Sequence, residues 1–281
     1  MHRVALLSSA MVGLLAAGAA ARAEERDPVD APASLRVETQ LFAAGDEPVA
    51  RSLTLFAEGV AWDFLELPVG DGGLEVVEIV LHDPARERVV VVDPARHLKT
   101  QIDTIRLERL GASLAKWARR ADDRLVRWAG GPDFAAGFTE REGRLELAGP
   151  RVRYVVAHEP APSAEAAVRY RRFADTAILL KALLHPGGVP PFPRLAINDR
   201  LAQAAALPVE VTLDLDSAFG ALQGRAGRLR SVHKIHPRLI NGDPERIHDA
   251  EAEVAASESV DLPAYMGSVP ADPGRHGAPG S

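Results

Sequence analysis

The feature that most constrains the fold is a set of predicted strands that are apolar on both faces. Segment 88–92 reads RVVVV, and in segment 60–67, VAWDFLEL, apolar residues occupy both alternating sets of positions. Side chains of a strand point alternately to the two faces of its sheet, so a strand with one wet face alternates apolar and polar residues. Segment 209–216, VEVTLDLD, does so. The central strands therefore require apolar cover on both faces, or a cavity on one.

Short strands separated by turns fill the first part of the chain. Between Leu35 and Asp103, six β-rich runs follow one another with polar or Gly- and Pro-containing breaks, which favours an antiparallel meander. The letters DPAR occur twice, at 83–86 and 93–96. An Asp side chain accepts from the backbone ahead of it, and Pro sets φ for the second turn position. We therefore interpret each copy as a chain reversal rather than a ligand motif.

Amphipathic helices are predicted to cover this sheet. Segment 104–129 carries apolar residues at spacings of three and four, and a second helix is predicted over 164–184 with Ser163 as its N-cap. The order of strands, long helix, strands and helices favours an α+β fold. We expect a curved antiparallel sheet, an unclosed half-barrel of about nine to eleven strands, whose concave face the helices cover. The stripe of the first helix consists of Leu107, Leu110, Leu114, Trp117, Ala121, Leu125 and Trp128.

Residues 1–23 have the pattern of a secretory signal peptide. A short basic start is followed by an apolar stretch over 4–20 and by Ala21-Arg22-Ala23, which predicts cleavage after Ala23. The alternative, a membrane anchor, is disfavoured because the stretch is rich in Ala and Gly and shorter than the roughly 20 strongly apolar residues of a spanning helix. We therefore predict export to a periplasmic or cell-envelope space.

The rest of the chain is predicted to hold one domain. Residues 24–33 are interpreted as a linker, 34–257 as a single half-barrel-like domain, and 258–281, rich in Pro and Gly, as a disordered tail. The chain has no Cys, so its core must stabilise it without disulfides. Its net charge of −6 argues against nucleic acid as a partner.

The sequence contains no catalytic signature. It has no GxSxG, no HExxH and no phosphate-binding loop. His233 and His236 are the best metal candidates, but residues three apart on a strand face opposite sides and do not converge. We therefore predict no metal, no cofactor and no catalysis.

The order of elements resembles that of the periplasmic lipoprotein-carrier superfamily, which sorts lipoproteins to the outer membrane. The resemblance lies in the leader, the opening meander, the segments LFAEGVAWDFLE and IVLHDPARERVVVVDPARHLKTQI, and the intervening helices, over about residues 35–240. It implies an unclosed half-barrel lidded by helices, an apolar cavity that takes acyl chains or lipoproteins, and no catalysis. None of that family's polar functional residues matches a position of this chain.

We expect an exported soluble carrier that shelters an acyl chain, lipid or lipoprotein between sheet and helices, with transient membrane contact at most. The alternatives are an envelope structural or interaction protein with a self-filled core, and a hydrolase with a dispersed active site. Large side chains on the apolar faces are expected to line the cavity. They are Trp62, Phe64, Val90, Val92, Leu114, Trp117 and Leu125.

Overall fold

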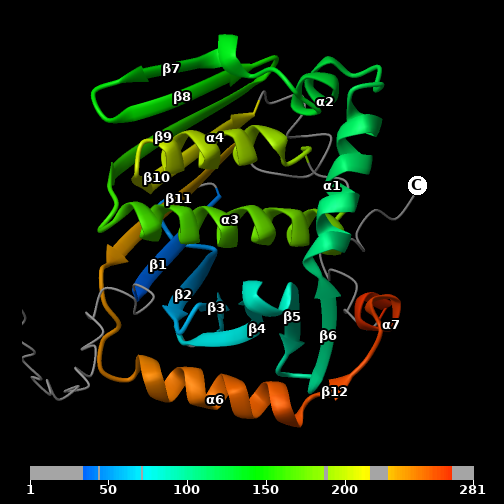
Figure 1. Ribbon diagram of the computed structural model, residues 1–281, viewed down its shortest axis with the longest axis vertical. Helices are drawn as coiled ribbons and strands as arrows, with labels where there is room; N and C mark the ends of the chain where they lie inside the picture. The colour runs from blue at the N-terminus through cyan, green and yellow to red at the C-terminus, as the bar shows by residue number, and fades with distance from the viewer. Residues whose placement is uncertain (1–33, 44, 71, 187–188, 216–226, 268–281) are drawn as a thin grey trace, which may run out of the picture. The chain divides into compact units, whose positions relative to one another are not determined.

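The computed structural model describes residues 34–43, 45–70, 72–186, 189–215 and 227–267. Within these ranges six α-helices accompany one unclosed, mainly antiparallel sheet of twelve strands (Figure 1). The predicted α+β class is confirmed, whereas the predicted count of nine to eleven strands is too low. The signal peptide and most of the linker lie outside the described residues.

The first six strands form the predicted antiparallel meander, each strand pairing with the one before it. Turns of two to seven residues leave little chain between them. They are β1 (Leu35–Phe42), β2 (Ala50–Ala57), β3 (Val60–Pro68), β4 (Leu74–Asp83), β5 (Arg88–Asp93) and β6 (Leu98–Asp103).

Both DPAR segments are chain reversals, as predicted. The carboxylate of Asp83 accepts from the amide of Arg86 at 3.2 Å, and that of Asp93 accepts from the amide of Arg96 at 3.0 Å. The first copy forms a short 3-10 helix, η2 (Pro84–Arg86). The residues after the two copies have φ values of 51° and 50°, which completes each reversal in the same left-handed conformation.

The second part of the chain extends this sheet. Its last long strand pairs with β1, so the two parts form the order β12-β6-β5-β4-β3-β2-β1-β11-β10-β9-β8-β7. The elements are α1 (Thr104–Ala118), α2 (Arg124–Ala129), η3 (Ala135–Gly137), β7 (Phe138–Arg141), β8 (Arg144–Gly149), β9 (Val152–Pro160), α3 (Ala164–Leu184), α4 (Phe192–Gln203), β10 (Ala206–Leu215), β11 (Arg228–His236), α6 (Asp243–Ala256), β12 (Glu258–Ser259) and α7 (Leu262–Gly267).

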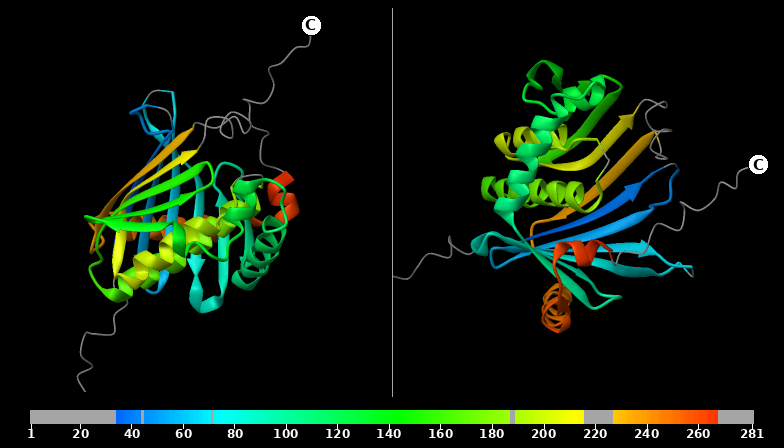
Figure 2. Two further views of the ribbon diagram at one scale, coloured as in Figure 1. Left: turned by 90° about the horizontal axis from the view of Figure 1, so that it is seen from above. Right: turned by 90° about the vertical axis from the view of Figure 1, so that its right-hand side faces the viewer.

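Helices cover both faces of the sheet. Helix α3 has 21 residues and is therefore about 31 Å long, enough to cross six or seven strands spaced about 4.8 Å apart. Its Phe173 packs with residues of β1, β2 and β3, and its Leu180 with residues of β4, β5 and β6. We call the face under α3 and α4 the inner face. Helix α6 packs on the opposite, outer face, well apart from α3 and α4 (Figure 2).

The predicted helix over 104–129 is two helices, because Asp123 caps a new one by accepting from the amides of Leu125 and Val126. The buried residues of α1 are Leu107, Gly111 and Ala118. A Cβ on Gly111 would lie 3.2 Å from Leu179 of α3, so small residues make this contact. Trp117, one residue from Ala118, is turned away by about 100° and is 59% exposed. The prediction that Trp117 faces the sheet is wrong.

The predicted disordered tail begins too early. Glu258 of β12 pairs in parallel with Leu98 of β6, and α7 buries Leu262 and Tyr265. The guanidinium of Arg96 lies 5.4 Å from the centre of the Tyr265 ring. These apolar anchors, missed among the Pro and Gly residues, extend the ordered domain to 267; residues 268–281 lie outside the described residues.

Candidate functional site

The structure divides the seven residues predicted to line one cavity among separate places. Leu125 belongs to an apolar cluster with β8, β9, β10 and α4, Leu114 is partly buried, and Trp117 is exposed. The remaining four lie on the outer face, packed with Ala250 of α6. The separation arises because α6 covers the Trp62 side of the sheet, while α1 packs on α3. These four are Trp62, Phe64, Val90 and Val92.

The outer face of β2–β5 is a closed apolar layer. Trp62 is 4% exposed and Val92 is fully buried, and Leu239, Ile247 and Val254 of the α6 region pack against them. This layer supplies the second apolar cover that the central strands require. Its side chains fill their own space, so it contributes to stability.

The inner face carries a row of polar side chains that crosses four strands. Strand register places His233 opposite Thr39 and Thr39 opposite Ser52, while Thr54 lies opposite Asp63. The hydroxyls of Ser52 and Thr54 donate to Asp63 Oδ1 at 2.5 and 2.7 Å. Burial raises the pKa of the Asp63 carboxyl, and these hydrogen bonds oppose that rise. We call these five residues the inner polar row.

His233 is held as a neutral imidazole at one end of the row. Its Nδ1 lies 2.9 Å from Thr39 Oγ1, and its Nε2 lies 3.0 Å from Ser231 Oγ. Burial, aided by the positive charge of Arg194, lowers the pKa of His233 to about 3. His236 Nε2 instead lies 3.4 Å from Glu38 Oε1, and strand parity puts it on the other face, as predicted.

A cation of α4 lies above this end of the row. Arg194 follows Pro191 and Pro193 in the first turn of α4, where Pro suits the helix start. Its Nη1 donates to Asn198 Oδ1 at 2.5 Å, and Asn198 Nδ2 donates to Asp175 Oδ1 at 2.7 Å. Among the described residues no carboxylate forms an ion pair with Arg194. Burial lowers the pKa of its guanidinium.

Two tyrosines complete the surroundings of this cation. Burial raises the pKa of Tyr154, on β9, to about 12, and also raises the pKa of Tyr170, on α3. In both cases the positive charge of Arg194 acts against the rise, so the guanidinium lies close enough to influence both phenols. Because the positive charge of Arg194 acts on Tyr154, Tyr170 and His233, we call these four residues the Arg194 cluster.

Several residues of the inner polar row and the Arg194 cluster are only partly buried. Burial shifts the pKa of Arg194, His233 and Asp63, but each residue retains an intermediate solvent exposure. Thr39 and Ser52 of the row do so as well. The outer layer, where Trp62 and its neighbours are buried, differs in this respect. Parts of these residues therefore remain at the surface of the protein.

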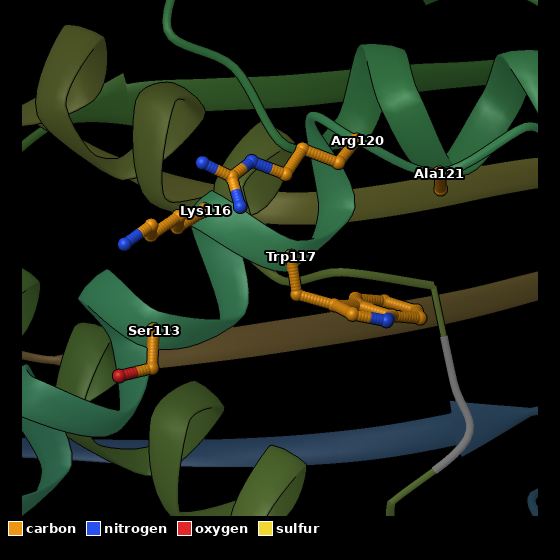
Figure 3. Close-up of a pocket in the computed structure, with 5 residues that line it drawn as sticks. All are labelled: Ser113, Lys116, Trp117, Arg120 and Ala121. Carbon is orange, nitrogen blue, oxygen red and sulfur yellow. The ribbon is translucent and has the colours of Figure 1, made fainter.

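Two depressions lie elsewhere on the described surface. One, of about 350 Å³, is formed by α1 and the residues after it around Trp117 (Figure 3). The other, of about 220 Å³, lies between the β2–β3 turn and α3 and includes His82, Glu165, Arg169 and Arg172. Burial and the charge of Arg172 lower the pKa of His82 to about 4.

Sequence reasoning missed the Arg194 cluster because its members come from α3, α4, β9 and β11. The available signal was the alternation of side chains between the two faces of a strand. By this alternation Thr39, Ser52, Thr54 and Asp63 are polar residues on the face that also carries buried apolar residues. In the described ranges no three His, Asp or Glu side chains are grouped as metal ligands, and no helix has the length and apolarity to cross a membrane. No protein-family model matches the sequence, and no curated protein matches it.

Proposed function

We propose that the protein is a non-catalytic carrier that binds an amphiphilic anion, an acyl chain with an acidic head group, between the inner face and α3 and α4. The proposal includes export with cleavage after Ala23, kinship with the lipoprotein-carrier superfamily, and the inner face as the concave side of a half-barrel. Lipids and the acyl chains of lipoproteins are the classes of ligand that we propose.

The observation that carries the proposal is the Arg194 guanidinium. A charge taken into a protein interior costs several kcal/mol unless a partner compensates it. Arg194 has only the neutral amide of Asn198 as a hydrogen-bond partner in the described part of the chain. The carboxylate of Asp175 attracts this cation but reaches it only through Asn198. A carboxylate or phosphate on a ligand would supply a counter-charge in direct contact, and the planar guanidinium matches either group through two parallel hydrogen bonds.

Apolar clusters lie between the sheet and each of the two helices. Under α3, Val37 of β1 and Phe56 of β2 are buried with Phe173. Under α4, Val156 of β9 and Val211 of β10 are buried with Ile197. A site with apolar walls and a few placed polar groups is typical for ligands that are mostly hydrocarbon. The combination of these apolar clusters with the Arg194 cation favours an amphiphile over a small polar anion as the ligand.

The Ser231–His233 pair argues against the hydrolase alternative. Its Oγ–Nε2 distance of 3.0 Å matches that of a nucleophile and its base. However, the other ring nitrogen faces the Thr39 hydroxyl instead of a carboxylate. A base works best when its pKa lies near the working pH, and the pKa of His233 is lowered to about 3. We therefore assign the pair a structural role.

The test compares two ligands that share a chain and differ in charge. Dodecanoate and dodecan-1-ol are titrated against wild type and Arg194→Gln, with displacement of a fluorescent fatty-acid analogue as readout. A hydrogen bond to a charged group contributes about 1.5–3 kcal/mol. We therefore expect dodecanoate to bind at least tenfold more tightly than the alcohol, and Arg194→Gln to remove that preference.

Arg200→Gln is the matched control, because Arg200 lies on the same helix but is exposed; it should retain wild-type affinities. Circular dichroism checks that each variant is folded. If neither ligand displaces the analogue, and solvent extracts of purified protein contain no lipid by mass spectrometry, the interior is self-filled and the structural alternative holds. Equal affinity of wild type and Arg194→Gln for dodecanoate would also refute the assignment.

A further inference from the structure

Helix α1 presents a continuous stripe of cations and one tryptophan to solvent. Each member lies three or four residues from another member, so they share one side of the helix and its C-terminal extension. Each is exposed, because the opposite side of α1 packs on α3 through Gly111. We call these residues the α1 stripe; they are Arg106, Arg109, Ser113, Lys116, Trp117 and Arg120.

The charge of this segment is opposite to that of the whole chain. Residues 104–121 hold five cations and one carboxylate, a net charge of +4, whereas the 281 residues carry −6. No described carboxylate forms an ion pair with the cations of the stripe. The local positive charge is therefore available to an external anionic surface.

Trp117 lies near the C-terminal end of the stripe. Its 59% exposure contrasts with the 4% exposure of Trp62. Ser113, Lys116, Trp117, Arg120 and Ala121 line the open depression of about 350 Å³. Figure 3 shows the indole standing off the helix to one side, with the charged ends of Lys116 and Arg120 extending to the other side of the view. An indole beside such cations has an apolar body and a polar edge, which suits the boundary between water and hydrocarbon.

We propose that the α1 stripe is a docking surface for an anionic lipid bilayer. A helix that lies in the plane of a membrane carries Lys and Arg on one flank and Trp or aliphatic residues toward the acyl chains. Each cation near an anionic leaflet adds attraction, and the stems of Lys and Arg lie along the apolar boundary. Ile105, 46% exposed and one turn before Arg109, extends the apolar contact.

Docking through the stripe would place α1 against the membrane. Helix α1 packs on α3, and α3 covers the inner face. The surface is separate from the Arg194 cluster, and the inference does not depend on ligand binding there. Arg194→Gln should therefore leave docking unchanged, and Trp117→Phe should leave dodecanoate binding unchanged. The two proposals can fail independently.

The experiment is co-sedimentation of the folded protein with vesicles of phosphatidylcholine alone or mixed with phosphatidylglycerol. We expect binding to the mixed vesicles, little to the neutral ones, and release as salt screens the charges. Lys116→Glu with Arg120→Glu should weaken the partition coefficient at least tenfold. Arg144→Glu with Arg238→Glu makes the same charge change at two exposed positions off the stripe and should have a much smaller effect.

Brominated lipid, which quenches a nearby indole, tests whether Trp117 itself enters the interface. We expect wild-type emission to be quenched on mixed vesicles and Trp117→Phe, still bound, to lose most of that quenching. Absence of sedimentation with anionic vesicles would overturn the inference and leave the stripe to an acidic protein partner. Equal losses in the stripe and control double variants would overturn it as well, because the attraction would then be general.

Discussion

The inner and outer faces of the sheet are built from the same strands but bury different chemistry. On β3, Trp62 and Phe64 point outward into a closed apolar layer under α6, whereas Asp63 points inward and accepts from two hydroxyls. The outer layer is apolar throughout, whereas the inner face combines buried apolar clusters with the inner polar row. Most of the fully buried large side chains belong to the inner clusters, so we infer that both faces stabilise the fold and that only the inner face also buries polar groups.

The difference also explains why α6 and α3 differ in character. Helix α6 contributes aliphatic side chains to the layer around Trp62. Helices α3 and α4 bring Asp175, Asn198 and Arg194 into a hydrogen-bonded chain over the inner face. Buried polar groups of this kind cost stability unless they are fully paired, so their retention points to a function.

The strongest test of the outer face is Trp62→Ala. Truncation of a buried aromatic residue removes its contacts and leaves a cavity, which costs about 3–5 kcal/mol. Urea denaturation followed by far-ultraviolet circular dichroism should show a midpoint far below that of wild type. A loss under about 1 kcal/mol would mean that the outer layer contributes little to stability.

The inner face should make stability depend on pH. The pKa of His82 falls from 6.5 to about 4 on folding, so its contribution is fully present above pH 6.5 and is lost as the pH falls toward 4. The loss amounts to about 3 kcal/mol. Urea unfolding across this window should show a flatter profile for His82→Gln than for wild type. His248→Gln, exposed on α6, should keep the wild-type slope.

Asp63→Asn should stabilise the protein at neutral pH by about 1 kcal/mol. Burial raises the pKa of Asp63 above its ordinary 3.8, so the folded state disfavours the carboxylate, while Asn still accepts from Ser52 and Thr54. Below pH 3.8 the carboxyl is protonated in both states and the gain should disappear. Differential scanning calorimetry at several pH values measures this; a loss of stability at pH 7 would contradict it.

The smallest effect is expected for Trp117→Ala. With 59% of its surface exposed, Trp117 contributes little to the core, and the change in unfolding free energy should stay within about 0.5 kcal/mol. The same urea titration that detects Trp62→Ala provides the measurement. A loss above about 2 kcal/mol would show that the indole packs as the sequence pattern predicted, and would remove the α1 stripe as a free surface.

Local patterns predicted much of the fold. The apolar residues on both faces of β3 and the run RVVVV required apolar cover on both faces or a cavity on one, and apolar clusters cover both faces. The DPAR turns and the opposite orientations of His233 and His236 also followed from sequence, because turn chemistry and strand parity act over a few residues.

The alternation of side chains along a strand does not say which helix covers which face. The prediction that Trp62, Leu125 and the other five residues line one cavity was therefore wrong. Leu107 and Gly111 bring α1 against α3, so Trp117, on the other side of α1, is left outside.

The sequence by itself determined the α+β class, the turns and the need for two apolar layers, since each depends on neighbouring residues. Only the tertiary structure placed Arg194 among Tyr154, Tyr170 and His233. The Thr39–His233 contact joins residues 194 positions apart, through the pairing of β1 with β11. Such a pairing depends on how the whole chain closes, because the free energy that selects it comes from packing between distant segments.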